Sequence, residues 1–468
     1  MVFSSFVFLL AFLPIVLLLY YLCPARLRNL VLLVFSLVFY AWGEPVYVLI
    51  MLFSIVFDYA NGRLIEHFKN KNCPGKAKAA LIVDLCGNLA ILGFFKYTDF
   101  VIGSINSITG AGLSLLHIAL PIGISFYTFQ TMSYTIDVYR GEVAAQKNIL
   151  TFATYVTLFP QLIAGPIVQY KTVEKELMHR KVTLEDFSEG AFRFSVGLAK
   201  KVLLANQIGS LWDSISQLNH MSVATAWLGA IAYSFQIYFD FSGYSDMAIG
   251  LGKMFGFDFM ENFNYPYIST SIREFWRRWH ISLSTWFREY LYIPLGGNRK
   301  GQVRTYVNLL IVFFATGLWH GAGATFIIWG LYHGLFLVVE RMGLGKLLEK
   351  NCFRGLNHIY TALVVVVGWV FFRADTLADA KVILHQMFTW ENGIYPASLF
   401  VNRKVIFLAV LGVLLSGIAQ SICPKLREHL YEKEVTKTVD IVIMAVLLFL
   451  CTMYLVSSTY NPFIYFRF

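Results

Sequence analysis

FSSFVFLLAFLPIVLLLYYL, the stretch at residues 3–22, has no charged side chain and is long enough to cross the roughly 30 Å hydrocarbon core of a bilayer as a helix. Comparable apolar runs recur at 357–373, 405–422 and 438–457. Hydrophobic residues make up 57% of the 468 positions and charged residues only 14%, too little charge to cover a soluble domain of this size. These runs predict an all-α polytopic transmembrane protein with about 11–13 membrane helices and further re-entrant or in-plane helices, forming one membrane domain over 1–468.

The basic residues predict the orientation of the helices. The net charge is +10, yet no basic module lies between the apolar runs, so we expect positive cytoplasmic loops rather than a nucleic-acid site. Placing the basic clusters in the cytoplasm puts the N-terminus outside, together with the C-terminal tail at 458–468. The six cysteines show no CxxC or Cys/His spacing, so no metal site is expected.

A segment rich in arginine and aromatic residues, SIREFWRRWHISLSTWFREYLYIPLGG, occupies 271–297. Guanidinium groups among aromatic rings suit the cytoplasmic interface of the bilayer, where they can bind phosphates. A positive-inside anchor helix is an equally good interpretation of this composition. The candidate residues for binding the phosphates of a donor substrate are Arg273, Trp276, Arg277 and Trp279. His280 and Ser284 are four positions apart, so they would share one face of a helix.

A second unusual segment, TGLWHGAGATFIIWGLYHG, spans 316–334 and holds a histidine between glycines. From the preceding basic loop, residues 305–318 rise by at most about 21 Å as a helix, which is short of a full crossing. We therefore expect His320 within the membrane, followed by a glycine turn and a returning helix over 324–340. An ionisable group at that depth marks a candidate functional site, although hydrogen bonding to a neighbouring helix is the commoner role of a lone histidine. His333 is expected to serve packing.

Polar side chains also interrupt the apolar sequence YFDFSGYSDMAIG at 238–250. Such groups line a cavity or pair internally, and we slightly favour pairing that holds helices together over a tunnel wall. The candidate tunnel-lining residues are Asp240, Ser242, Asn308 and Trp319. PQLIAGP at 160–166 is typical of a broken helix at membrane depth, which is tolerated where protein buries it or where it lines a cavity.

These segments resemble the membrane-bound O-acyltransferase (MBOAT) family over nearly the whole chain. YFDFSGYSDMAIG, FWRRWHISLSTWFREYLYIPLGG, GLWHGAGATFIIWGLYHG, LFPQLIAGPIVQY and the closing NPFIYFRF are similar to the subgroup that contains the membrane subunit of alginate O-acetylation. The resemblance implies a fold with a central tunnel. It also implies that the histidine of the LWHG motif, His320, is catalytic and that His280 is the second characteristic histidine, which we expect to orient the donor or its thiol leaving group.

The residues suit the chemistry that the resemblance implies. Acyl transfer from a thioester to a hydroxyl needs a base, and a neutral imidazole is less costly to bury than a carboxylate. We expect His320 to be this base, acetyl-CoA to be the acyl donor, and no bound cofactor. The resemblance further implies a bacterial cytoplasmic membrane protein that serves a polysaccharide acceptor through an extracytoplasmic, hydrolase-like Ser-His-Asp partner.

Three alternatives stay open on the sequence. D-alanyl or other acyl transfer from a carrier protein to a cell-envelope polymer would use the same motifs. A transporter or flippase would also have many helices, broken segments and buried polar groups, but the chain shows no internal repeat. A structural subunit of a secretion complex would leave an intramembrane histidine unexplained.

The C-terminal tail ends in NPFIYFRF at 461–468 and is too hydrophobic to extend into water, so we expect it to fold back into a cavity from the outer side. An interfacial aromatic anchor explains the same composition. A cytoplasmic donor and an external polymer, however, need a hydroxyl carrier between them. A phenol ionises near pH 10, so His320 would deprotonate a tyrosine more easily than an alcohol. We therefore expect Tyr465 to be a transient acetyl carrier.

Overall fold

The computed structural model describes residues 1–218, 220–350, 354–389, 393–422, 438–457, 460–462 and 464. Within these ranges the chain forms helices and no strand, apart from an isolated bridge between Met221 and Tyr395. The predicted all-α fold is confirmed. The chain contacts cluster into two compact units, unit 1 (Met1–Ala191 with Met247–Met260) and unit 2 (Phe192–Asp246 with Glu261–Phe468). A single membrane domain stays a prediction, because clustering of contacts does not measure independent folding.

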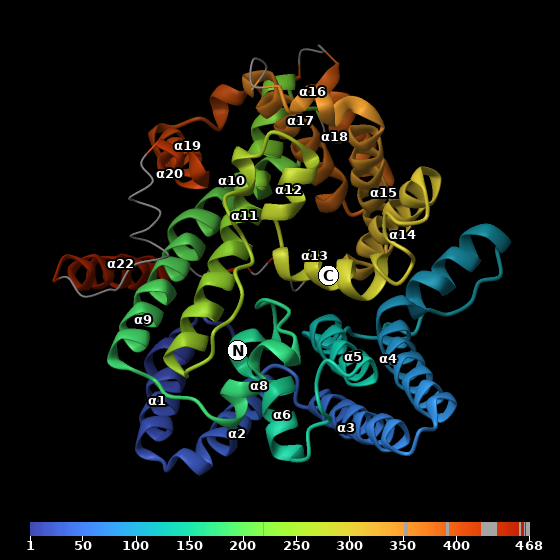
Figure 1. Cartoon of the computed structure of the whole chain (residues 1–468). Coiled ribbons are helices and arrows are strands. Elements are labelled where there is room, and N and C mark those ends of the chain that lie inside the picture. The colour runs from blue at the N-terminus through green and yellow to red at the C-terminus, as the bar shows by residue number, and fades with distance from the viewer. Residues whose placement is uncertain are drawn as a thin grey trace. The chain divides into compact units, whose positions relative to one another are not determined.

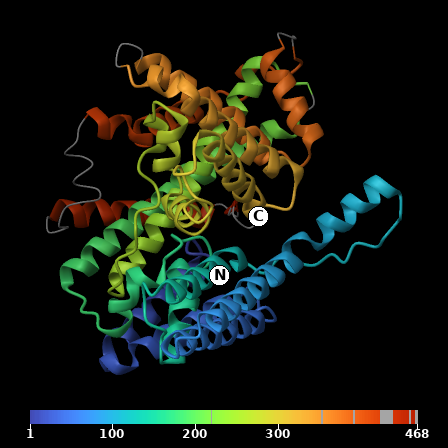
Figure 2. The same ribbon diagram turned by 45° about the vertical axis from the view of Figure 1, so that its right-hand side comes forward.

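Unit 1 packs short and long helices around a phenylalanine core. Its buried members Phe3, Phe8, Phe12, Phe39 and Phe159 have ring centroids 4.9–6.4 Å apart. Figures 1 and 2 show the end of α4 and the loop after it extending beyond the other helices of unit 1. The elements are η1 (Val7–Phe12), α1 (Leu13–Leu22), η2 (Ala25–Leu27), α2 (Arg28–Ala41), α3 (Val48–Asn70), α4 (Pro74–Thr109), α5 (Ile124–Arg140), α6 (Ile149–Thr157), α7 (Phe159–Leu162) and α8 (Tyr170–Met178).

The predicted break at 160–166 is confirmed, and it is buried inside unit 1. α7 lasts about one turn, and the backbone after it is not helical until α8 begins. Side chains pair with backbone groups on both sides of the break. The Tyr155 hydroxyl donates to Val168 O at 2.9 Å, and Phe159 N donates to Ser36 Oγ at 3.0 Å. These contacts thus replace the backbone hydrogen bonds that a continuous helix would form across the break.

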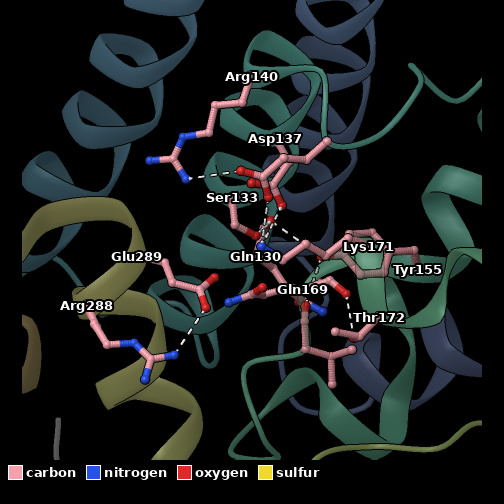
Figure 3. A network of polar contacts seen from close by, with 12 residues as sticks. Gln130, Ser133, Asp137, Arg140, Tyr155, Gln169, Lys171, Thr172, Arg288 and Glu289 are labelled. Atoms are coloured by element: carbon pink, nitrogen blue, oxygen red, sulfur yellow. Dashed lines mark hydrogen bonds and ion pairs between the residues drawn. The ribbon is translucent and has the colours of Figure 1, made fainter. Parts of the chain in front are cut away.

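An ion network links α5 to the start of α8 in unit 1 (Figure 3). Lys171 Nζ lies 3.0 Å from Glu142 Oε2 and 3.9 Å from Oδ2 of the buried Asp137. Arg140 Nη1 lies 3.8 Å from the other oxygen of Glu142. The network therefore places a cation beside Asp137, the one fully buried carboxylate among these four side chains.

Unit 2 contains the whole of the segments 271–297 and 316–334, and it shares two helices with unit 1, α9 (Leu184–Ala199) and α11 (Val223–Met254). Its other described elements are η3 (Lys200–Ala205), α10 (Asn206–Ser216), η4 (Pro266–Ile268), α12 (Ile272–Arg278), α13 (Ile281–Phe287), η5 (Arg288–Tyr292), α14 (Gln302–His320), α15 (Ala324–Val339), η6 (Glu340–Leu344), α16 (Gly345–Leu348), α17 (Arg354–Arg373), α18 (Leu377–Phe388), η8 (Ala397–Leu399), α19 (Arg403–Val413), η9 (Leu414–Ile418), α20 (Ala419–Ile422) and α22 (Thr438–Ser457).

Helices α14 and α15 lie side by side as a hairpin (Figure 1), and glycines let their backbones approach closely. A Cβ atom at Gly317 would lie 2.4 Å from Phe326 O, and one at Gly330 would lie 2.2 Å from Phe313 O. Any larger residue at these glycines would force the two helices apart. The turn between the helices is formed by residues 321–323, which confirms the predicted hairpin.

Five helices in the described ranges are long and apolar enough to cross a membrane: α3, α4, residues 324–348 (α15 to α16), α17 and α22. In α22 only 11% of the apolar window is buried by protein, as expected of a helix that contacts lipid. The run at 3–22 forms η1 and α1, while the run at 405–422 is kinked at Gly417, where φ is +126°. The chain is a multi-pass membrane protein, whereas the number of crossings and the orientation stay predictions.

Candidate functional site

His280 lies at a sharp break between α12 and α13 rather than inside a helix. Its backbone has φ +44° and ψ +57°, a left-handed conformation that costs a non-glycine residue on the order of 1–3 kcal/mol. A backbone bond from Ile281 N to Asn262 O, 2.9 Å long, helps to hold the break. The predicted helix face shared with Ser284 is therefore wrong, because the chain changes direction at His280 before α13 begins.

His320 is the last residue of α14 and is buried. Its ring centroid lies 5.0 Å from that of Trp329 and 5.2 Å from that of Phe372. The ring centroids of His280 and His320 lie 6.4 Å apart, and Phe241 packs against His280 at 4.6 Å. Two histidines from separate motifs thus form one buried imidazole pair among aromatic rings, close enough for one small acyl or hydroxyl group to contact both.

Asn262, in the loop before α12, is fully buried and joins three segments of unit 2. Its Oδ1 lies 3.1 Å from His280 Nδ1 and accepts hydrogen bonds from Ser282 N at 3.2 Å and Ser282 Oγ at 2.9 Å. Its Nδ2 donates to Ser245 Oγ on α11 at 2.9 Å. Sequence reasoning missed this residue, because an asparagine between aromatic residues in a loop gives no local signal of its partners.

A basic cleft of about 1070 Å³ lies in unit 2 beside α12. Its cationic lining residues are Arg273, Arg277, Arg278, Lys350 and Arg354, and its acidic ones are Glu274, Glu340 and Glu349. Arg278 is paired with Glu274 at 2.9 Å, whereas Arg273 and Arg277 are exposed and have no ion pair with a described residue. Two of the predicted donor-binding residues therefore present guanidinium groups to the cleft.

The buried carboxylate of Glu340 fixes the start of α12 at this cleft. It accepts hydrogen bonds from Ile272 N at 2.6 Å and from Arg273 N at 3.0 Å. These are backbone donors of the first helical turn, which have no partner within the helix. Glu340 thus anchors the backbone from which Arg273 extends.

The other two predicted donor-binding residues, Trp276 and Trp279, are buried and do not line the cleft. Trp276 packs against Trp329 with a centroid distance of 5.7 Å, and Trp279 packs against Trp369 at 4.8 Å. The ring of His333 lies 5.2 Å from that of Trp276, and neither of its nitrogens has a hydrogen-bond partner among the described residues, so its packing role stays a prediction. These tryptophans belong to the aromatic cluster that surrounds the imidazole pair.

The candidate tunnel-lining residues have different surroundings in unit 2. Trp319 lies beside the imidazole pair, with its ring centroid 6.0 Å from that of His280. Asn308 donates to Gly297 O at 2.9 Å, and Ser242 is buried without a hydrogen-bond partner among the described residues. The Asp240 carboxylate lies 2.5 Å from Lys201 Nζ, so this aspartate pairs internally, as we favoured. A central tunnel stays a prediction.

A second buried ion cluster, which sequence reasoning did not find, surrounds Asp246. Arg193 Nη2 and Lys200 Nζ lie 2.8 and 2.5 Å from its two carboxylate oxygens. Arg193 also pairs with Glu261 at 2.5 Å. Since each buried charge has an opposite charge and hydrogen bonds, the cluster holds α9, η3 and α11 together rather than presenting a reactive atom.

The described tail residues, 460–462 and 464, contact side chains of unit 2, whereas the predicted cavity and its outer position stay predictions. Ile464 N donates to Asp240 Oδ2 at 3.0 Å, and Lys201 donates to Pro462 O. The Tyr460 hydroxyl donates to Asp213 Oδ2 at 2.5 Å. The Asp240–Lys201 pair therefore binds tail backbone on both its sides. The remainder of the tail carries the predicted acetyl carrier, Tyr465, and lies outside the described residues.

The imidazole pair can act as a base and cannot be assigned as a metal centre. In the described ranges, no three His, Cys, Asp or Glu side chains are grouped so that they could hold a metal ion. Burial lowers the pKa of His280, so its ring is neutral near pH 7. A neutral imidazole enclosed by aromatic rings, with water largely excluded, suits proton abstraction from a hydroxyl.

Comparison with known proteins gives a consistent result. A sequence model of the MBOAT, membrane-bound O-acyltransferase family, matches residues 142–378, which include both histidines and the arginines of the cleft. A probable alginate O-acetylase AlgI of Pseudomonas aeruginosa is 50% identical over 84% of this chain and 76% of its own length. A peptidoglycan O-acetyltransferase of Helicobacter pylori is 35% identical over 100% of this chain and 98% of its own. A teichoic acid D-alanyltransferase of Bacillus subtilis is 28% identical over 53% of this chain and 66% of its own.

Proposed function

The chain belongs to the membrane-bound O-acyltransferase family, and from this premise we propose that it transfers an acetyl group from cytoplasmic acetyl-CoA toward a polysaccharide outside a bacterial cytoplasmic membrane. It is an O-acyltransferase, so the transporter and structural-subunit alternatives are set aside. In this proposal His320 is the base that takes the proton of the attacking hydroxyl, which becomes acylated as the thioester releases its thiol.

The imidazole pair is the observation that carries this proposal. His280 and His320 are 40 positions apart in the sequence, yet their rings meet in one buried aromatic cluster. A thioester is already activated, so a positioned base is sufficient and neither a metal nor a covalent protein nucleophile is required. The exposed guanidinium groups of Arg273 and Arg277 suit the phosphates of coenzyme A in the adjacent cleft of unit 2.

Acetyl transfer and the second candidate, D-alanyl transfer, differ in the acyl donor. The donor is acetyl-CoA in the first and an acyl-loaded carrier protein in the second. The acetyl donor is favoured because the alginate O-acetylase covers 84% of this chain at 50% identity, against 53% at 28% for the D-alanyltransferase. Purified protein in detergent is to be given acetyl-CoA or an acyl-loaded carrier protein in parallel. We expect release of free thiol from acetyl-CoA only. Turnover with the loaded carrier and none with acetyl-CoA would establish the alternative.

An acetyl relay through the tail completes the proposal. We propose that the Tyr465 hydroxyl accepts the acetyl group and passes it to the serine of an extracytoplasmic Ser-His-Asp partner. The support is that the described residues just before it, Pro462 and Ile464, are bound to buried side chains of unit 2. Tyr465→Phe removes only the hydroxyl, so polymer acetylation in cells should stop while the protein level stays normal. Normal acetylation by this variant would leave the tail as an anchor.

A further inference from the structure

The hydrogen bonds of Asn262 determine which nitrogen of His280 carries the proton. The Ser282 backbone N–H can only donate, so the Asn262 atom that faces it is the oxygen Oδ1. The same oxygen lies 3.1 Å from His280 Nδ1. An amide oxygen has no hydrogen to give, so His280 Nδ1 must be the donor. The neutral ring is therefore protonated on Nδ1, and Nε2 carries a lone pair.

The second nitrogen of His280 is left available for a ligand. Nε2 is buried and has no hydrogen-bond partner among the described residues. A buried polar atom without a partner is costly, and its retention points to a group that binds there. The described rings that pack against it are those of Phe241, Phe263, Trp319 and His320. Among these four, only His320 can titrate.

We propose that Asn262 is a positioning residue that fixes His280 with Nε2 unprotonated, so that Nε2 accepts a hydrogen bond from an O–H or N–H group of a bound substrate. This inference rests on the proposed acyl transfer and narrows the role of His280. A neutral ring held in this way has no proton on Nε2 to give to a departing thiolate. His280 therefore acts as a hydrogen-bond acceptor, and its partner is either the attacking hydroxyl or an amide N–H of the pantetheine arm.

The anchoring of Asn262 explains how it fixes the ring. Its Nδ2 donates to Ser245 on α11, and its main-chain oxygen accepts from Ile281 N. The main-chain bond holds the loop, and the side-chain amide is held by Ser245 at Nδ2 and by Ser282 at Oδ1, so it cannot turn to offer Nδ2 to the ring without losing these bonds. A misplaced His280 ring would lower turnover on the order of 100-fold, as small displacements of reacting groups do.

The first test measures the tautomer directly, without substrate. Protein labelled with ¹⁵N in its histidine rings, in detergent, should show a His280 signal with the proton on Nδ1, identified by its loss in His280→Gln. In Asn262→Ala the two tautomers should become mixed. The matched control is Asn264→Ala, because the described bonds of Asn264 run through its backbone. A proton on Nε2 in the unmodified protein would overturn the proposal, whether or not the protein turns over acetyl-CoA.

The second test uses Asn262→Asp, which keeps the oxygen that faces His280 and Ser282. The new negative charge favours the protonated imidazole and so raises the pKa of His280. Protonation of Nε2 then occurs at higher pH, and the titration of His280 followed by its ring ¹⁵N signal should move up by about one pH unit or more. A titration identical to that of the unmodified protein would contradict a positioning role.

Kinetics of Asn262→Ala show which group binds His280 Nε2, the pantetheine amide or the attacking hydroxyl. Acetyl-CoA is the donor, and release of free thiol is measured. A rise in the KM for acetyl-CoA identifies the pantetheine amide, because ground-state binding is then lost. A fall in kcat at unchanged KM identifies the attacking hydroxyl. Unchanged kcat and KM would overturn the proposal. If the unmodified protein releases no thiol from acetyl-CoA, the proposed function fails, while the tautomer measurement still stands.

Discussion

The imidazole pair and the Asp246 cluster are both buried polar groups of unit 2, but their hydrogen bonding differs. Around Asp246, two cations bind the two carboxylate oxygens at 2.8 and 2.5 Å. At the imidazole pair, aromatic side chains enclose both rings, and His280 Nε2 has no hydrogen-bond partner among the described residues. The first arrangement satisfies every charge and stabilises helix packing. The second leaves a lone pair available, which is what a chemical step requires.

This difference also distinguishes two breaks in the chain. The break at 160–166 is buried, and side chains of unit 1 pair with backbone groups around it. The break at His280 is also buried and bonded, but it places a titratable ring in a left-handed conformation beside a second histidine. Irregular buried backbone is therefore not itself a sign of function, whereas a break that places an unpartnered ring nitrogen beside a second histidine is one.

The largest expected effect is on activity and comes from the imidazole pair. His320→Ala should lower turnover of acetyl-CoA by about 10²–10⁴-fold, the contribution of a general base, while the protein still inserts and folds. Thiol release by purified variant measures this. The matched control is His333→Gln in the same hairpin, whose ring is also buried but is expected to serve packing, and which should lose only a few-fold. Substantial turnover by His320→Ala would remove His320 as the base.

The Asp246 cluster should show the opposite pattern, with stability as the affected quantity. Asp246→Ala removes the carboxylate that pairs with both Lys200 and Arg193, and breaking a buried ion pair from one side costs about 3–5 kcal/mol of unfolding free energy. The Tm in detergent checks this. Arg63→Gln serves as the control, because its pair with Glu66 is partly exposed and is worth no more than about 1 kcal/mol. Equal Tm values for both variants would show that the cluster is not structural.

His280→Ala should have an intermediate effect on activity. The base stays in place while a hydrogen-bond acceptor for the substrate is lost, so we expect turnover to fall on the order of 100-fold without disappearing. Single-turnover thiol release at saturating acetyl-CoA is the measurement. A complete loss, equal to that of His320→Ala, would assign both rings a shared catalytic role and would remove the distinction between them.

The smallest effect is expected at the basic cleft. Replacing Arg273 and Arg277 together with Gln removes two contacts to donor phosphates and should raise the KM for acetyl-CoA more than it lowers kcat. Because both guanidinium groups are exposed and screened by solvent, each contact is worth about 1 kcal/mol or less, so a rise on the order of tenfold is expected. Arg341→Gln, an exposed residue that does not line the cleft, is the control. An unchanged KM would return this segment to the role of a membrane anchor.

Several features of the site follow from local sequence alone. The hairpin that begins after His320 follows from the glycines at 321–323, and the structure has it, whereas the depth of His320 in the membrane stays a prediction. The composition of 271–297 predicts arginines that can bind phosphates, and Arg273 and Arg277 both line the cleft. Length, helical period and glycine content act within a few residues, so the sequence reports them directly.

The contacts that select among these residues are long-range, and only the folded chain decides them. Trp276 and Trp279 look like part of the arginine-rich segment, but packing with Trp329 and Trp369 directs them into the aromatic cluster. The left-handed turn at His280 depends on a bond to Asn262, and nothing in the local composition indicates it.

The apolar runs and motifs of the sequence indicate the helical class, the family and which two histidines are the candidate site residues. Tertiary structure decides that these histidines meet, that Asn262 orients one of them, and that the Asp240 carboxylate binds the returning tail. The physical reason is that helix formation depends on local composition and length. Hydrogen-bond partners of buried groups, by contrast, depend on which segments packing brings together, here from positions up to 261 residues apart.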